Sequence, residues 1–125
     1  MNELAMIIED DEDLASIFAE ALRGIGYEVE HFADGKIAQQ RLTSGSVPFL
    51  ILLDMHLPHV SGADLLTNII RKEERFSKTT VIITTADARM GETYSDQADF
   101  VLIKPISFIQ LRDLTNRLKS KEDRA

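Results

Sequence analysis

Three kinds of polar side chain follow the apolar runs of this sequence: carboxylates, a hydroxyl group and an ammonium group. Carboxylates that meet at one place repel one another unless a cation lies between them, and oxygen ligands in a chain without cysteine favour Mg²⁺. An Asp carboxylate beside Mg²⁺ can attack a phosphorus atom and form an acyl phosphate, while a Lys and a hydroxyl group neutralise the phosphoryl oxygens. The residues that could do this are Glu9, Asp10, Asp54, Thr85 and Lys104.

Each residue type suggests a role in such a site. Asp54 would be the nucleophile, and Glu9 and Asp10 would hold the metal directly or through water. Lys104 would pair with Asp54 or with its phosphoryl group, and the Thr85 hydroxyl would donate to a phosphoryl oxygen. A single acid after a strand is usually a loop residue or a helix cap, so the prediction depends on the convergence of these groups.

Parallel strands would bring these residues together, because ligands bind at the carboxyl ends of the strands in open α/β sheets. Five short apolar runs alternate with helical patterns. Several of these runs are apolar on both faces, as in a central strand that helices cover on both sides. The sequence therefore predicts an α/β domain with a five-stranded, doubly wound parallel sheet. The runs are Leu4–Ile8, Tyr27–Phe32, Phe49–Leu53, Thr80–Thr84 and Phe100–Ile103.

Helices with a clear apolar face are expected after four of these strands. The first face includes Ile17 and the second includes Ile37. Over Asp87–Asp99 the apolar stripe is thin and Gly91 interrupts it, which predicts a short fourth helix. Asp11 either caps the first helix or joins the metal ligands. The predicted N-cap residues are Asp13, Asp34 and Ser61, and the last helix is expected to start near Ser107.

Composition limits the number of domains, the possible partners and the location of the protein. The 125 residues are 44% hydrophobic, enough for one core, so we expect a single domain over residues 1–125 in which 119–125 could form a tail or linker. The formal net charge of −7 argues against binding to nucleic acid. No apolar run approaches the length of a membrane span, the N-terminus lacks a basic signal region and cysteine is absent, so the protein should be soluble and cytoplasmic.

The candidate residues lie in motifs that resemble the receiver domain of bacterial response regulators, the phosphoacceptor part of two-component signalling. The motifs occur in the family's order, and the resemblance covers essentially the whole chain. They are Ile7-Ile8-Glu9-Asp10-Asp11, Leu52–Pro58 followed by Ser61-Gly62, Thr84-Thr85-Ala86, and Lys104-Pro105.

The resemblance implies a flavodoxin-like fold with strand order 2-1-3-4-5, and transfer of a phosphoryl group to Asp54 from the phospho-His of a histidine kinase or phosphotransfer protein. It implies that Asp10, Asp54 and the backbone carbonyl of His56 hold Mg²⁺, with Glu9 at the family's other acidic position. A protein of this kind changes its binding to a partner or effector domain and could form a homodimer. It turns over no metabolite, and its catalysis is limited to its own phosphorylation and dephosphorylation.

The chain departs from the family at Val101, where Tyr or Phe is usual; Phe100 is one residue earlier and is expected on the opposite face of the strand. The segment between Thr85 and Lys104 is also about one helical turn shorter than is typical. We therefore expect an atypical output surface on the fourth helix and fifth strand. Two alternatives remain: an Mg²⁺-dependent aspartyl-phosphate hydrolase, and an unphosphorylated interaction module with a receiver-like fold.

Overall fold

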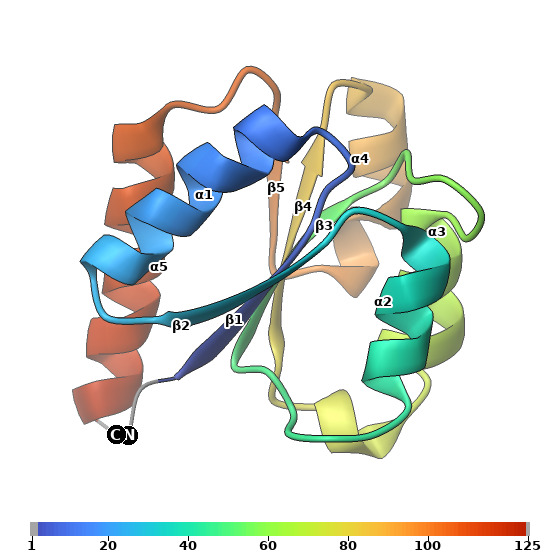
Figure 1. The fold of residues 1–125 in the computed structure, drawn as a ribbon, viewed down its shortest axis with the longest axis horizontal. Coiled ribbons are helices and arrows are strands. Elements are labelled where there is room, and N and C mark those ends of the chain that lie inside the picture. The colour runs from blue at the N-terminus through green and yellow to red at the C-terminus, as the bar shows by residue number, and fades with distance from the viewer. Residues whose placement is uncertain (1–2, 125) are drawn as a thin grey trace.

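The five predicted strands form one parallel sheet in the computed structural model, which describes residues 3–124. The strands are β1 (Leu4–Ile8), β2 (Glu28–Phe32), β3 (Leu50–Asp54), β4 (Thr80–Thr85) and β5 (Phe100–Ile103). Their order across the sheet is β2-β1-β3-β4-β5 (Figure 1), and every neighbouring pair is parallel. The expected doubly wound, flavodoxin-like fold is thus confirmed.

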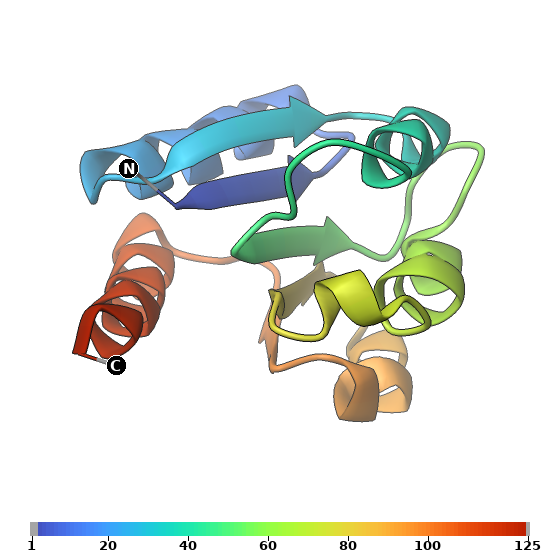
Figure 2. The ribbon, with the colours of Figure 1, turned by 90° about the horizontal axis from the view of Figure 1, so that it is seen from below.

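Helices cover both faces of the sheet, as the two views in Figures 1 and 2 show. One face carries α1 (Glu12–Gly24) and α5 (Phe108–Arg124). The other carries α2 (Gly35–Leu42), α3 (Gly62–Leu65) and α4 (Ala88–Tyr94). A π-helical turn, η1 (Leu66–Ile70), continues α3, and two 3₁₀ turns, η2 (Glu74–Phe76) and η3 (Ser95–Gln97), precede β4 and β5.

Alternate residues of the strands pack in two separate cores, because successive side chains of a strand point to opposite faces. In β3, Leu52 belongs to the core under α1 and α5, whereas Ile51 and Leu53 belong to the core under α2, α3 and α4. All the residues of β3 are buried, as expected for a central strand with helices on both sides. This arrangement leaves the strand ends as the place where polar side chains can gather.

Two predicted helix caps are confirmed, Asp34 and Ser61, and the last helix starts near Ser107 as expected, where the Ser107 hydroxyl accepts the Gln110 N–H at 2.9 Å. For the first helix the sequence left two cap candidates, and the structure confirms Asp11 and excludes Asp13. Asp11, not Asp13, begins α1, and its Oδ1 accepts the Leu14 N–H at 3.1 Å. The backbone at Asp11 is extended, so its carboxylate can fold back to the helix amides, whereas Asp13 is already part of the first turn.

Two residues assigned to apolar helix faces are exposed, Ile17 by 45% and Ile37 by 53%. Each lies at the margin of its helix's apolar stripe. In α2, for example, Ala38 and Leu42 occupy the centre of the stripe and are fully buried. A helix contacts the sheet along a narrow line, so positions at the margin of its apolar stripe stay in solvent.

The segment between β4 and β5 contains the short helix that the sequence predicted. α4 has seven residues and is followed directly by η3.

Towards the C-terminal end of the described residues, Lys119 lies within α5, and its Nζ donates to the Ile25 carbonyl at 3.0 Å. The suggested tail or linker therefore starts inside this helix, and Ala125 lies outside the described residues. Among residues 3–124, no helix combines the length and hydrophobicity needed to cross a membrane.

Candidate functional site

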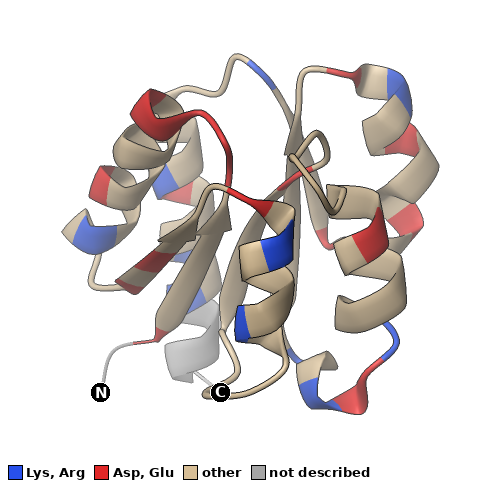
Figure 3. Ribbon diagram, turned by 45° about the vertical axis from the view of Figure 1, so that its right-hand side comes forward, with Lys and Arg blue, Asp and Glu red and all other residues tan. Residues whose placement is uncertain are grey.

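The strand register brings the predicted acids to one edge of the sheet. Ile8 pairs with Leu53, so Glu9 and Asp54 are the next residues along two adjacent strands. Carboxylate oxygens of Glu9, Asp10 and Asp54 lie within 4.8 Å of one another. Figure 3 shows the acidic segment that leads from β1 into α1. Three of the predicted metal ligands are therefore brought together by segments about 45 residues apart in sequence.

Lys104 reaches the same cluster from the end of β5. Its Nζ lies 2.8 Å from Glu9 Oε1 and 3.6 Å from Asp54 Oδ2. Burial alone would lower the pKa of Lys104, but its contact with Glu9 and the charge of Asp54 outweigh burial and raise this pKa above its usual value. The predicted partner of Asp54 is present, but its ammonium group lies closer to Glu9.

Asp54 is held in one orientation by its surroundings. The residue is only 3% exposed, and its Oδ1 accepts the His56 N–H at 3.2 Å. A Cβ at Gly62 would lie 2.1 Å from the Asp54 carbonyl oxygen, so only glycine allows α3 to start this close to β3. With Oδ1 fixed by the loop, Oδ2 is the oxygen that faces Lys104.

The donor set of this cluster fits a hard divalent cation. Three carboxylates and one ammonium group leave a formal charge of −2 when all are ionised. Glu9 is 1% exposed, and its Oε1 makes the ion pair with Lys104 but no well-formed hydrogen bond within the described part of the chain. A buried, incompletely satisfied carboxylate is costly, and a cation with oxygen ligands would remove that cost.

Burial raises the pKa of Glu9 to about 7; Lys104 opposes this rise, and the nearby charge of Asp54 adds to it. In the unfolded chain Glu9 should titrate near 4.5, its ordinary value. Between these two values the folded state retains a proton that the unfolded state has released. Stability from this group is therefore full below the lower value and is lost as pH rises through the higher one.

Glu9→Gln should flatten the pH dependence of stability of the metal-free protein. Between pH 5 and pH 8 the wild type should lose on the order of 3 kcal/mol through Glu9, because the group must ionise in a buried site. The variant cannot ionise and should lack this loss. Urea unfolding of both proteins in EDTA at the two pH values gives the comparison, and equal changes for the two proteins would refute the assignment.

Thr85 lies at the same edge, but its hydroxyl is engaged elsewhere. Thr84 pairs with Asp54, which places Thr85 one residue further along β4. Thr85 is fully buried, and its Oγ1 accepts the Asp87 N–H at 3.0 Å. The hydroxyl therefore faces the start of α4. Within the described part of the chain, it makes no hydrogen bond with Asp54.

Asp87 is a site residue that the sequence analysis missed. It caps α4 through its Oδ1, its N–H binds Thr85, and its Oδ2 lies 3.9 Å from Nε2 of His56. A signal was present, since an Asp two residues after a strand-end Thr and just before a helical stretch is a typical cap.

Of the two roles that the sequence left open for Asp11, the structure shows the first: Asp11 caps α1 and is not part of the carboxylate cluster. The role of the His56 carbonyl stays a prediction.

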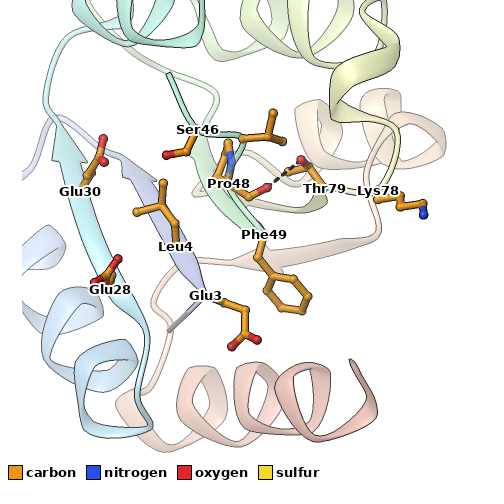
Figure 4. A pocket seen from close by; sticks show the side chains of 10 residues that line it. Glu3, Leu4, Glu28, Glu30, Ser46, Pro48, Phe49, Lys78 and Thr79 are labelled. Carbon is orange, nitrogen blue, oxygen red and sulfur yellow. Dashed lines mark hydrogen bonds between the residues drawn. The ribbon is translucent and has the colours of Figure 1, made fainter. Parts of the chain in front are cut away.

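A hollow of about 800 Å³ lies far from these groups, at the amino ends of the strands (Figure 4). It is open to solvent and is lined by acidic and apolar side chains, among them Glu3, Glu28 and Phe49. The hydroxyl of Thr79 beside it already donates to the Pro48 carbonyl at 2.8 Å. The hollow is therefore at the edge of the sheet opposite the carboxylate cluster, and none of the three carboxylates of that cluster lines it.

Comparison with known proteins agrees with the geometry. A family model described as the response regulator receiver domain matches residues 5–116. The chain is 32% identical over 125 residues to a protein described as a probable methanogenesis regulatory protein, FilR2, of Methanothrix harundinacea (strain 6Ac), covering 93% of this chain and 81% of that one. It is 32% identical over 123 residues to the transcriptional regulatory protein DpiA of Escherichia coli (strain K12), covering 94% of this chain.

Solved structures with the same fold include the receiver domain of the Francisella response regulator 1452, with a TM-score of 0.82, 25% identity, and coverage of 97% of this chain and 99% of that one. The chemotaxis response regulator CheY4 of Vibrio cholerae has a TM-score of 0.83 at 20% identity, covers 94% of this chain and 99% of its own, and shows the fold alone. The chain spans only 52% of DpiA and 50% of the transcriptional regulator RpaA of Synechocystis.

Proposed function

The chain belongs to the response regulator receiver domain family, and from this premise we propose that it is a phosphoacceptor switch in which Asp54 takes a phosphoryl group from the phospho-His of a histidine kinase. Phosphorylation then changes which partner the domain binds. The observation that carries the proposal is the position of Asp54, a carboxylate 3% exposed at a strand end, within 4.8 Å of two further acids and 3.6 Å from an ammonium group.

We infer that the cofactor is Mg²⁺. Asp10, Asp54 and the backbone carbonyl of His56 would hold it, with Glu9 alongside. The all-oxygen donor set, the formal charge of −2 and the incompletely satisfied Glu9 oxygen support this assignment. When bound, the ion would supply positive charge to the phosphoryl oxygens and reduce the repulsion among the carboxylates.

The transfer itself is a displacement at phosphorus. The Asp54 Oδ2 lone pair forms the new O–P bond while the P–N bond to the donor imidazole breaks, and the leaving nitrogen keeps that electron pair and takes up a proton. Lys104 would move from Glu9 to the incoming phosphoryl oxygens, and the Thr85 hydroxyl would donate to one of them. Both residues neutralise charge that builds up at the site.

The partners of the domain follow from this role. A histidine kinase or phosphotransfer protein would deliver the phosphoryl group, and an effector domain or a separate protein would receive the signal. FilR2, DpiA and RpaA carry regulatory names, and the last two are about twice as long as the matched region, which supports an effector outside it. We place the domain in the cytoplasm, acting through protein contacts, a homodimer among them, and not through nucleic acid.

The test is to incubate the purified protein with Mg²⁺ and a small phosphoryl donor, acetyl phosphate or phosphoramidate, and to measure its intact mass. We expect a species heavier by one phosphoryl group, which disappears when EDTA replaces Mg²⁺. An unmodified protein under these conditions would support an unphosphorylated interaction module instead. Steady release of phosphate from a small ester that survives the loss of Asp54 would support a hydrolase.

A further inference from the structure

Helix α4 rests on the sheet through a residue without a side chain. Gly91 is buried, whereas α4 residues on either side of it are exposed or half-buried. A Cβ at Gly91 would lie 2.7 Å from Val101 Cγ1, 3.4 Å from Thr85 Cγ2 and 3.5 Å from Ile103 Cδ1. The backbone of α4 therefore sits directly on side chains of β4 and β5.

Space, not backbone conformation, explains glycine at this position. The glycines with positive φ among the described residues are Gly26 and Gly45, so Gly91 has an ordinary helical backbone. Glycine inside a helix costs about 1 kcal/mol relative to alanine. The close approach of Val101 makes alanine impossible here without a shift, because a β-branched side chain on a strand has little freedom to move away.

The same contact holds Thr85, and α4 touches both branches of its side chain. The Thr85 Oγ1 accepts the N–H of Asp87, the residue that caps α4. The Thr85 Cγ2 faces Gly91 one helical turn later. Because Thr85 is fully buried, the depth at which α4 sits on β5 determines where its hydroxyl can be.

We propose that Gly91 is a positioning residue: its missing side chain seats α4 on Val101 at the depth that sets the Thr85 hydroxyl for the phosphoryl group on Asp54. This inference rests on the proposed function. A methyl group at Gly91 would lift α4 from Val101 and carry the Asp87 N–H away from Thr85. A smaller side chain at residue 101 would make room for that methyl group and let α4 return to its packing position on β5.

The experiment compares wild type, Gly91→Ala, Val101→Ala and the double variant under the phosphorylation conditions given above. Gly91→Ala should lower the maximal rate of phosphorylation about tenfold, with the donor concentration for half-maximal rate unchanged, because only the hydroxyl that donates a hydrogen bond to a phosphoryl oxygen is displaced. The double variant should recover to within about threefold of Val101→Ala. Gly24→Ala is the matched control, since nothing lies within 4 Å of a Cβ there.

Hydrogen exchange of the Asp87 amide tests the same packing of α4 on Val101 without any phosphorylation. Gly91→Ala should speed this exchange about tenfold and the double variant should restore the protection, while circular dichroism confirms that all variants are folded. Wild-type rate and protection in Gly91→Ala, or a double variant that recovers neither, would overturn the inference. If the wild type takes up no phosphoryl group but the exchange pattern holds, the proposed function fails and the packing contact stands.

Discussion

Replacing Asp54 by Asn is expected to abolish phosphorylation by acetyl phosphate and to leave the fold intact. The amide has nearly the shape of the carboxylate, and its oxygen can still accept the His56 N–H, which in the wild type lies 3.2 Å from Oδ1. It lacks the anionic oxygen that would form the bond to phosphorus. Intact mass after incubation with Mg²⁺ and donor measures the loss, and Asp113→Asn on the exposed surface of α5 should be phosphorylated like wild type.

The same substitution should stabilise the metal-free protein. The charge of Asp54 contributes to the raised pKa of Glu9, so a neutral residue at position 54 removes a repulsion between two buried acids. We expect a gain of about 1 kcal/mol in urea unfolding at pH 8, together with weaker Mg²⁺ binding, because one ligand has lost its charge. If Asp54→Asn is still phosphorylated at one site, another residue is the acceptor and the proposed function is wrong in its central assignment.

Lys104→Met should slow phosphorylation by about a hundredfold and yet strengthen Mg²⁺ binding. The ammonium group lies 2.8 Å from Glu9 and 3.6 Å from Asp54, so removing it leaves three carboxylates without a cation from the protein. A divalent ion is then attracted more strongly, because the formal charge of the site changes from −2 to −3. The phosphoryl group, by contrast, loses the side chain that neutralises its oxygens.

The opposite directions of these two effects make the experiment diagnostic. Mg²⁺ affinity is measured by titration of the apo protein, and the rate by intact mass over time. Lys72→Met, at an exposed position after η1, is the matched control and should change neither quantity. A Lys104→Met variant that loses both rate and Mg²⁺ affinity would indicate a damaged site, and one with a wild-type rate would show that Lys104 does not contact the phosphoryl group.

Much of this site could be predicted from the sequence because its residues lie at strand ends. Asp54 follows a run of apolar residues that is buried on both faces, and in a parallel sheet such an end meets the ends of its neighbours. Glu9, Asp10 and Lys104 also follow predicted strands, so they were expected at the same edge of the sheet. Contacts within this group were less predictable: Lys104 lies closer to Glu9 than to Asp54, and this depends on side-chain positions that no spacing rule fixes.

The strand runs, their alternation with helices and the chemical kinds of residue at the carboxyl edge follow from the amino-acid order, since they depend on periodicity and on hydrogen bonds within a few residues. Three features follow only from packing: Ile17 and Ile37 stay in solvent, the Asp87 N–H binds the Thr85 hydroxyl, and α4 packs through Gly91 against Val101. Such contacts depend on the depth and angle at which a helix packs on a sheet, which many distant side chains set together.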